Sequence, residues 1–485
     1  MANSQVNSQS VSSVSHLRLM LAGNGDLEHS GFAAGSVVLS RPGPAPHAAI
    51  TWAGCWHVAS LPHRRRRSTP PAAVDASRSL DKADSSVYGR TVSTTPSVAV
   101  IGAGIGGVAV AATLRLAGVE VTVYEQASQF QRIGAGIQMM PNSMKVLRRI
   151  GVDDVLRQRS FWPYSHLNRA GGTGEVMREL PMPESLFGAP YLCMHRGDLH
   201  RALVSVLPDG VIRLGRKLTG LDETRGSGVC MSFADGSTAT ADAVVGADGI
   251  HSRVRELIVG GDNPVHKGRI AYRAVFPAAL LDRDLGDSRT KWWGTDRHIV
   301  IYYTTRDKSE VYFVTSVPEP AGWLTKESWS ATGDVGELRA AYEGFHPDVR
   351  AALAACPGCH KWAILEREPL PRWTDGPIVL LGDACHPMTP YMAQGAATSI
   401  EDAAVLARCV AAAGAEDFEA AFRRYEAHRK PRTSRIQAIS SANTWMQGGD
   451  SDPAWLYGYD AWECSLDTGL PRRPGGSSGS TRQPR

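Results

Sequence analysis

The fold is decided by the stretch VAVIGAGIGGVAVAATLRLAGVEVTVYE, residues 98–125. An apolar strand at its start runs into Gly102, Gly104 and Gly107, and an apolar helix follows. Glycines at this spacing allow a tight turn, the close approach of a pyrophosphate to the backbone, and close packing of the helix. The N-terminal end of such a helix also favours phosphate through its dipole. A dinucleotide-binding βαβ unit is therefore predicted at residues 96–130.

Glu125 ends the second apolar strand of this unit, about 20 residues after the glycines. A carboxylate at this position can bind a ribose hydroxyl, which indicates an adenosine site. The glycine pattern alone does not distinguish NAD from FAD. Two later segments agree with it on one cofactor, GADGIHS at residues 246–252 and GDACHPMTPYMAQGAATSIED at residues 382–402. The three segments together indicate FAD.

The last of these segments combines an acidic residue with the start of a helix. The apolar strand IVLL delivers Asp383 to a strand end, where ligands bind in open α/β sheets. Asp383 can bind a polyol hydroxyl there, although an N-cap is the alternative role. A helix is expected at 395–413, and its first amides near Gly395 and Ala396 can stabilise negative charge on a reduced flavin ring.

Composition excludes several classes of protein. The 485 residues exceed the usual size of a single core, so one large or two interlocked domains are expected. The net charge of +4 is spread along the chain without a basic, aromatic-rich stripe, which argues against a nucleic-acid partner. The eight cysteines lie far apart and no secretory segment is evident, so we expect reduced thiols in the cytoplasm. No apolar run reaches the roughly 18 residues that span a bilayer, so no membrane partner is expected.

The predicted fold class is α/β, with a Rossmann-like FAD-binding domain, an inserted and mostly antiparallel β-sheet domain that binds the substrate, and C-terminal helices. Strands such as RIAYRAVF, RHIVIYYTT and VYFVTSV indicate the inserted sheet. The expected parts are a disordered leader at 1–92, the first part of the FAD-binding domain at 93–263, the substrate-binding sheet at 264–365, the return of the FAD-binding domain with C-terminal helices at 366–460, and a disordered tail at 461–485. A targeting peptide or a mistranslated extension are the alternatives for the leader.

Local signals fix several element ends. A short helix fits SMKVLRRIG, with Asn142 as its N-cap and Gly151 as its stop. Asp235 and Gly236 mark a hairpin turn. Pro431 is expected to kink or interrupt the last long helix, because proline lacks the backbone N–H.

The strand RHIVIYYTT carries the candidate substrate chemistry. Side-chain alternation puts His298, Val300 and Tyr302 on one face. An imidazole and a phenol on a pocket wall can hold or deprotonate a hydroxyl on an aromatic ring. The alternative is a histidine and a tyrosine at a sheet surface without a catalytic role.

Five motifs in fixed order, GAGIGG, RIGAGI, HRGDLH, GADGIHS and GDACHPM, resemble the group A flavoprotein aromatic hydroxylases, the family of 4-hydroxybenzoate and salicylate hydroxylases. The resemblance covers residues 97–460 and implies a fold of the 4-hydroxybenzoate hydroxylase type. It also implies contacts with the cofactor: Arg196 in HRGDLH with FAD, Asp248 near the pyrophosphate, Asp383 with the ribitol, and Gly395 with Ala396 over the flavin pyrimidine.

Within the family, the stretches KWWGTDRHIVIYYTT, VYFVTSVPE, SSANTW and DPAWLYGYD resemble the 6-hydroxynicotinate 3-monooxygenase branch. That resemblance implies that His298 and Tyr302 face the substrate as catalytic residues. Gln138 and Tyr391 depart from the branch, which has histidines there, and they resemble the motifs of salicylate hydroxylases. A neutral amide cannot act as a base, and a phenol with a pKa of about 10 is a poor base near pH 7. We expect Gln138 and Tyr391 to line the substrate pocket through hydrogen bonds.

The resemblance implies an FAD-dependent monooxygenase that uses NADH and oxygen and converts 6-hydroxynicotinate into 2,5-dihydroxypyridine and carbon dioxide. Its expected partners are a small aromatic acid, NADH and oxygen. No second GxGxxG motif is present for the nicotinamide nucleotide, so NADH rests on the resemblance. The alternatives are a salicylate-type hydroxylase that gives catechol, a non-oxygenating flavoprotein reductase, and a flavin-binding redox sensor.

Overall fold

The computed structural model describes residues 95–467, except 133, 225–227, 262, 320–330, 415–416 and 447–451. The predictions for the leader at 1–92 and for residues 468–485 lie outside the described residues. Residues 461–467, which the sequence assigned to the tail, belong to the ordered part. Arg408 donates hydrogen bonds to the carbonyl oxygens of Ala461 and Cys464, and Leu466 is buried. The folded part therefore extends past the predicted boundary at 460.

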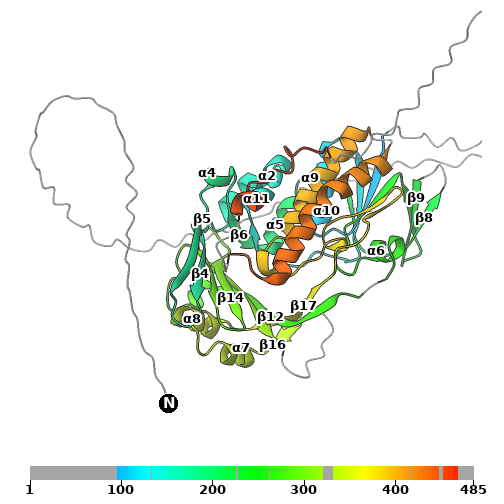
Figure 1. Ribbon diagram of the computed structural model, residues 1–485. Helices are drawn as coiled ribbons and strands as arrows, with labels where there is room; N and C mark the ends of the chain where they lie inside the picture. The colour runs from blue at the N-terminus through cyan, green and yellow to red at the C-terminus, as the bar shows by residue number, and fades with distance from the viewer. Residues whose placement is uncertain are drawn as a thin grey trace, which may run out of the picture. The chain divides into compact units, whose positions relative to one another are not determined.

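A six-stranded sheet forms the dinucleotide-binding part and confirms the predicted α/β class (Figure 1). In spatial order its strands are β18 (Thr374–Asp375), β19 (Ile378–Leu380), β11 (Ala243–Gly246), β1 (Ser97–Ile101), β2 (Glu120–Tyr124) and β7 (Ile212–Arg213). Neighbouring strands are parallel except for β18 with β19. Strands buried on both faces read as continuous apolar runs, as VAVI does here.

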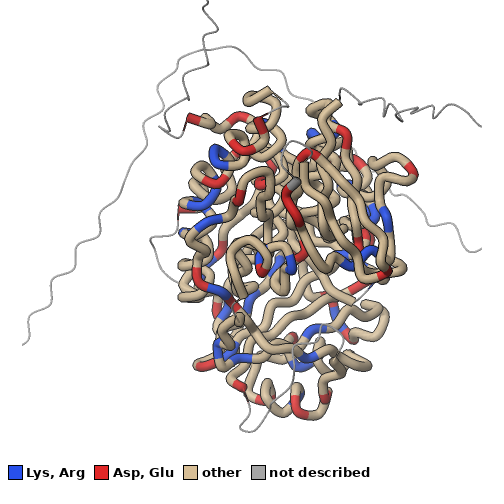
Figure 2. The backbone as a smooth tube through the Cα atoms, turned by 90° about the vertical axis from the view of Figure 1, so that its right-hand side faces the viewer, with Lys and Arg blue, Asp and Glu red and all other residues tan. Residues whose placement is uncertain are grey.

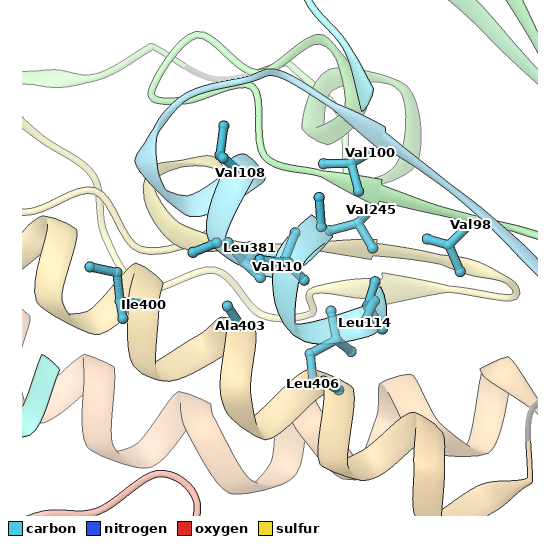
Figure 3. Close-up of a cluster of buried hydrophobic side chains, with 14 of the residues drawn as sticks. Val98, Val100, Val108, Val110, Leu114, Val245, Leu381, Ile400, Ala403 and Leu406 are labelled. Carbon is cyan, nitrogen blue, oxygen red and sulfur yellow. The ribbon is translucent and has the colours of Figure 1, made fainter. Parts of the chain in front are cut away.

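The core of this part lies between the sheet and the helices α1 (Ile105–Leu116) and α9 (Gly395–Ala413). Figure 3 shows Val108 and Val110 of α1 among side chains from β1, β11 and α9, including Ile400 and Ala403. The helix α9 has the bounds that the sequence predicted. It carries alanines at many of its buried positions, so helices can pack closely against it.

An eight-stranded sheet forms the second part. In spatial order its strands are β16 (Thr332–Gly333), β17 (Cys359–Glu366), β12 (Val265–Pro277), β15 (Glu310–Pro318), β14 (His298–Tyr303), β13 (Arg289–Trp293), β4 (Ser165–Ala170) and β5 (Val176–Pro181). All neighbouring pairs are antiparallel except β13 with β4. The strands β4 and β5 come from the segment 93–263, which the sequence assigned wholly to the FAD-binding domain. The substrate sheet is therefore built from two separate segments of chain.

Smaller elements complete the described fold. The remaining strands form a three-stranded sheet of β8 (Leu218–Thr224), β9 (Gly228–Phe233) and β10 (Thr238–Ala241), and a pair of β3 (Gly136–Met139) with β6 (Leu192–His195). The other helices are α2 (Pro141–Ile150), α3 (Asp153–Arg159), α4 (Glu184–Phe187), α5 (Arg196–Val204), α6 (Arg253–Ile258), α7 (Val335–Ala341), α8 (Pro347–Ala355), α10 (Phe418–Ala442) and α11 (Pro453–Tyr457), with 3-10 turns η1 (Ala278–Leu280), η2 (Gly382–Ala384) and η3 (Pro390–Met392).

Two of the predicted element ends are correct and one is wrong, and Pro431 does not interrupt its helix. The hairpin at Asp235 and Gly236 joins β9 to β10, and Gly151 ends α2 in a left-handed conformation. Asn142 does not cap α2, because Met140 is the N-cap. Asn142 is the second residue of the helix, and its side chain is buried. The helix α10 also continues through Pro431 to Ala442.

In the described part of the chain, basic and acidic residues are intermixed (Figure 2) and no helix could cross a membrane. Figure 2 shows Lys and Arg interspersed with Asp and Glu along the backbone, as the small net charge of +4 suggests. Among the described residues, no helix is both long enough and apolar enough to cross a membrane.

Candidate active site

The glycine turn after β1 has the geometry that its pattern predicts. Gly102 has a φ of +98°, in the left-handed region that favours glycine. A Cβ atom on Gly107 would lie 1.9 Å from the carbonyl oxygen of Gly102, so only glycine lets α1 pack this close to the turn. A Cβ on Gly104 would meet nothing within 4 Å. The backbone at Gly104 is therefore open to a ligand, as the approach of a pyrophosphate requires.

A cavity of about 750 Å³ begins at this turn. Glu125 lines it and accepts hydrogen bonds from the backbone N–H groups of Ala103 and Ala127, both at 2.8 Å. His200, which the sequence did not single out, also lines the cavity, and its Nε2 lies 2.7 Å from the Ala103 carbonyl oxygen. The fixed carboxylate and the open turn suit the adenosine end of a dinucleotide.

A second cavity, of about 340 Å³, adjoins the first. Gly104 and Arg196 line both cavities, so the two form one elongated site. Asp383 in η2 and Gly395 with Ala396 at the start of α9 line the second cavity. Burial lowers the pKa of Arg196, while the charge of Asp383 opposes this shift. These residues fit the ribitol and isoalloxazine end of FAD, because a carboxylate, a guanidinium and helix amides converge there.

Asp248 does not line either cavity. Its carboxylate accepts hydrogen bonds from the Ser252 hydroxyl at 2.5 Å and from the backbone N–H groups of Arg253 and Val254, at the start of α6. Its backbone lies against Gly102, where a Cβ would be 2.9 Å from the Asp248 Cα. The acidic side chain therefore orders α6, and the backbone of the motif supports the glycine turn.

The far wall of the second cavity is aromatic and polar. Gln138 of β3 and Tyr302 of β14 line it, together with Tyr312 of β15. The Tyr191 hydroxyl donates a hydrogen bond of 2.6 Å to the Oε1 atom of Gln138 and fixes the position of this amide. Burial raises the pKa of the Tyr302 phenol well above its ordinary value of 10, so this group stays protonated and can donate a hydrogen bond.

His298 and Tyr391 lie in a different cavity. That cavity has a volume of about 490 Å³, and their rings are in edge contact with centroids 5.4 Å apart. The Tyr391 hydroxyl lies 3.1 Å from the Ser316 hydroxyl. Burial, reinforced by the charge of Lys291, lowers the pKa of His298 well below 6.5. This imidazole is therefore neutral near pH 7.

This arrangement changes the expected pairing of site residues. The sequence grouped His298, Tyr302, Gln138 and Tyr391 around one pocket, whereas the structure pairs Gln138 with Tyr302 and His298 with Tyr391. Residues i and i+4 of a strand lie about 13 Å apart, at a rise of about 3.3 Å per residue. His298 and Tyr302 thus share a face but cannot hold the same hydroxyl group.

Sequence reasoning missed several residues of the second cavity. Tyr312 lies directly across from Tyr302 in the β14–β15 pair, with ring centroids 5.1 Å apart, and Val314 lies across from Val300. Arg273 of β12 lines the same wall and stacks 4.6 Å over the Trp362 ring. The alternation within VYFVTSV was a usable signal for Tyr312, but the alignment of this strand with β14 was not visible in the sequence.

Two buried neutral histidines predict a loss of stability in mild acid. Burial lowers the pKa of both His166 and His298 well below 6.5, and nearby Arg289 adds to the shift in each case. Below about pH 6.5 the unfolded chain takes up protons that the native state does not, so the free energy of unfolding falls as pH falls. We expect about 1 kcal/mol per pH unit from each histidine. Urea unfolding between pH 7.5 and 5 measures the slope, and His298→Gln should reduce it; an unchanged slope in that variant contradicts the assignment.

The fold and the joined cavities define an FAD-binding protein with a pocket lined partly by aromatic side chains. A family model described as an FAD binding domain matches residues 95–440. The chain is 46% identical over 380 residues to 6-hydroxynicotinate 3-monooxygenase of Pseudomonas fluorescens, covering 77% of this chain and 98% of that protein. It is 38% identical over 388 residues to a 3-amino-4-hydroxybenzoate 2-monooxygenase of Streptomyces platensis, covering 76% and 96%.

Among solved structures, a substrate complex of salicylate hydroxylase matches with a TM-score of 0.65 at 26% identity, covering 76% of this chain and 96% of that one. The chain belongs to the FAD-dependent aromatic hydroxylases and is a flavoprotein monooxygenase. This membership favours oxygenation over the alternatives of a reductase and a redox sensor.

Proposed function

We propose that the protein hydroxylates and decarboxylates a hydroxylated aromatic acid with NADH as reductant, and that 6-hydroxynicotinate is its substrate. The products are then 2,5-dihydroxypyridine and carbon dioxide. The observation that carries the proposal is the second cavity, in which Asp383 and Gly395 form one side and Gln138 and Tyr302 form the other. Its volume of about 340 Å³ suits a single-ring ligand beside a flavin. The relative from Pseudomonas fluorescens supports the choice of substrate.

FAD fits the residues of the joined cavities, and when bound and reduced it would supply the electrons that activate oxygen. Glu125 and Gly104 would hold its adenosine and pyrophosphate, and Asp383 would hold its ribitol. Gly395 and Ala396 would present backbone amides to the pyrimidine edge, where negative charge develops on reduction.

The protein prepares the substrate through its own hydrogen bonds. The protonated Tyr302 phenol donates a hydrogen bond to the anionic ring oxygen of the substrate, which favours the ionised and more nucleophilic ring. Gln138, which is hydrogen-bonded to Tyr191, adds a second polar contact next to the Tyr302 hydroxyl. His298 borders the neighbouring cavity and contacts the Tyr391 ring, so its role is to position Tyr391 and the wall between the two cavities.

Decarboxylation follows from the position of attack. A ring carbon that bears both the new hydroxyl and the carboxylate has no proton to lose. The carbon–carbon bond to the carboxylate therefore breaks, carbon dioxide leaves, and the bonding electron pair restores aromaticity. Hydroxylation and decarboxylation are then a single event.

The proposal is tested by following NADH oxidation, oxygen uptake and carbon dioxide release by the FAD-loaded protein with 6-hydroxynicotinate or salicylate. Coupled formation of 2,5-dihydroxypyridine is the expected result, with NADPH as a poorer reductant. Catechol from salicylate alone would assign the salicylate-type activity, which Gln138 and Tyr391 favour. NADH oxidation that neither acid stimulates would refute both assignments.

Substitutions on β14 test the proposed roles. We expect Tyr302→Phe to lower kcat/KM by roughly 10- to 100-fold, because it removes one hydrogen bond to an anionic oxygen. His298→Ala should lower turnover or the coupling of NADH oxidation to product. Tyr303→Phe is the matched control, since the Tyr303 hydroxyl bonds Asp284 on the other face of the strand. Fully coupled, wild-type turnover in the His298 variant would exclude its role.

A further inference from the structure

Arg289 is a buried cation at the start of β13. Only 7% of its surface is exposed. In the β13–β14 pair Lys291 lies across from Val300. Arg289 is two residues before Lys291, so it lies on the same face, and continuing the antiparallel register places it across from Tyr302. Neighbouring strands lie about 5 Å apart. The guanidinium group therefore belongs to the face of the sheet that carries the Tyr302 wall of the second cavity.

No acidic group among the described residues pairs with the Arg289 side chain. Within the described ranges its guanidinium makes no hydrogen bond or ion pair, and its Nε atom is buried without a partner. Apart from Lys291, the groups that its charge influences are uncharged, and they include His166 and the phenols of Tyr191 and Tyr302. The strands β13 and β14, with sequences RTKWW and HIVIYY, contain no acidic residue.

The other basic residue of β13 on the same face, Lys291, offers no compensation for the charge of Arg289. Lys291 is also buried, and its ammonium group lies 3.7 Å from the centre of the Trp293 ring and 3.2 Å from the Asn443 side-chain oxygen. Burial lowers the pKa of Lys291 well below its ordinary value, and the charge of Arg289 adds to this shift. Burying an uncompensated charge is costly, and arginine cannot escape the cost by losing its proton. The arrangement is favourable only if an anion enters from outside.

We propose that Arg289 binds the carboxylate of the aromatic acid substrate and selects for acids over the corresponding neutral rings. The planar guanidinium fork matches a carboxylate with two parallel hydrogen bonds. The carboxylate then lies at β13 while Tyr302 contacts the ring oxygen. This inference rests on the proposed function for the identity of the ligand as an aromatic acid.

Equilibrium binding to the FAD-loaded protein tests the inference without turnover. Perturbation of the flavin absorbance is titrated with two matched pairs, 6-hydroxynicotinate against 2-hydroxypyridine and salicylate against phenol. The wild type should prefer the acid in at least one pair. Arg289→Met should weaken binding of that acid by about 100-fold while leaving the neutral ring within a few-fold. Arg289→Lys should fall between the two, because it keeps the charge and loses the fork.

Thermal unfolding of the ligand-free protein provides the second readout. Arg289→Met should raise the melting temperature, because it removes an uncompensated buried charge. A saturating concentration of the preferred acid should stabilise the wild type more than the variant. The matched control is Arg169→Met, on the opposite face of the same sheet, whose guanidinium bonds the Gly174 carbonyl oxygen. That control should keep the preference for acids.

The outcomes separate this inference from the proposed function. Loss of acid preference in Arg289→Met supports the inference even if the wild type oxidises no NADH with these acids. Unchanged acid preference in the variant overturns it even if the wild type produces 2,5-dihydroxypyridine. A lower melting temperature or a failure of Arg289→Met to fold would also overturn it, since both indicate a structural role for the arginine.

Discussion

Replacing Gly107 by alanine is expected to abolish FAD retention. The new Cβ atom would lie 1.9 Å from the Gly102 carbonyl oxygen, a backbone atom that cannot move without opening the turn. The helix α1 must then shift away from β1, which costs about 1–3 kcal/mol or more and displaces the helix amides from the pyrophosphate position. Flavin absorbance per purified chain measures retention, and urea unfolding of the apoprotein measures the loss of stability.

Two alanine controls make this result specific. Gly104→Ala should leave the apoprotein as stable as the wild type, because a Cβ there meets nothing within 4 Å. It should still weaken FAD binding by more than about tenfold, since that space lies in both cavities of the cofactor site. Gly358→Ala, also in open space but away from the site, should change neither quantity. Wild-type flavin content in Gly107→Ala would contradict the close packing of turn and helix.

Arg429→Met is expected to cause the largest loss of stability. Arg429 is fully buried and donates hydrogen bonds of 2.7 Å to both Glu401 and Asp402 of α9. Burial favours the protonated acids, but the neighbouring positive charges keep the pKa of each carboxyl below its ordinary value. Removing the guanidinium leaves buried carboxylates short of a counter-ion, at a cost of about 3–5 kcal/mol. Urea unfolding of the purified protein measures this loss.

The same substitution should also affect the cofactor. Asp402 accepts hydrogen bonds from His386 at 2.6 Å and from the backbone N–H of Gly382 at 3.3 Å, and so fixes the turn that carries Asp383. Loss of the Arg429 contact should therefore loosen this turn and reduce flavin content. The control is Arg423→Met, on α10 like Arg429. The exposed ion pair of Arg423 with Glu419 contributes at most about 1 kcal/mol. Equal stability of the two variants would exclude the buried network as a support of α9.

Most residues of the proposed cofactor site could be selected from the sequence, because their signals are local. The glycine spacing specifies the turn at Gly102, and the strand end specifies Asp383 at the cavity. Asn142 shows the limit of such signals. Its residue type suggested an N-cap, but its amide donates to Glu401 and Gln394, both more than 250 positions further along the chain. A partner at that sequence distance has no local pattern.

The substrate region depended more strongly on tertiary structure. Alternation within β14 correctly placed His298 and Tyr302 on one face, but it could not show that they border different cavities. That division depends on which segments of the FAD-binding part lie against β14. Gln138 lies beside Tyr302, and Tyr391 lies beside His298. The substrate sheet also includes β4, whose contribution from residues 165–170 no pattern in the sequence indicated.

The sequence by itself determined the α/β class, the FAD cofactor and the family, because turn geometry, side-chain alternation and motif order are properties of short stretches. Only the tertiary structure decided the partners of each buried polar group. In the sequence Arg289 is one more basic residue of a strand. The absence of a counter-ion for it among the described residues is visible only when β4, β13 and β14 are aligned. Strand pairing and burial join residues far apart in the chain, so the charge balance of the site is a property of the folded protein.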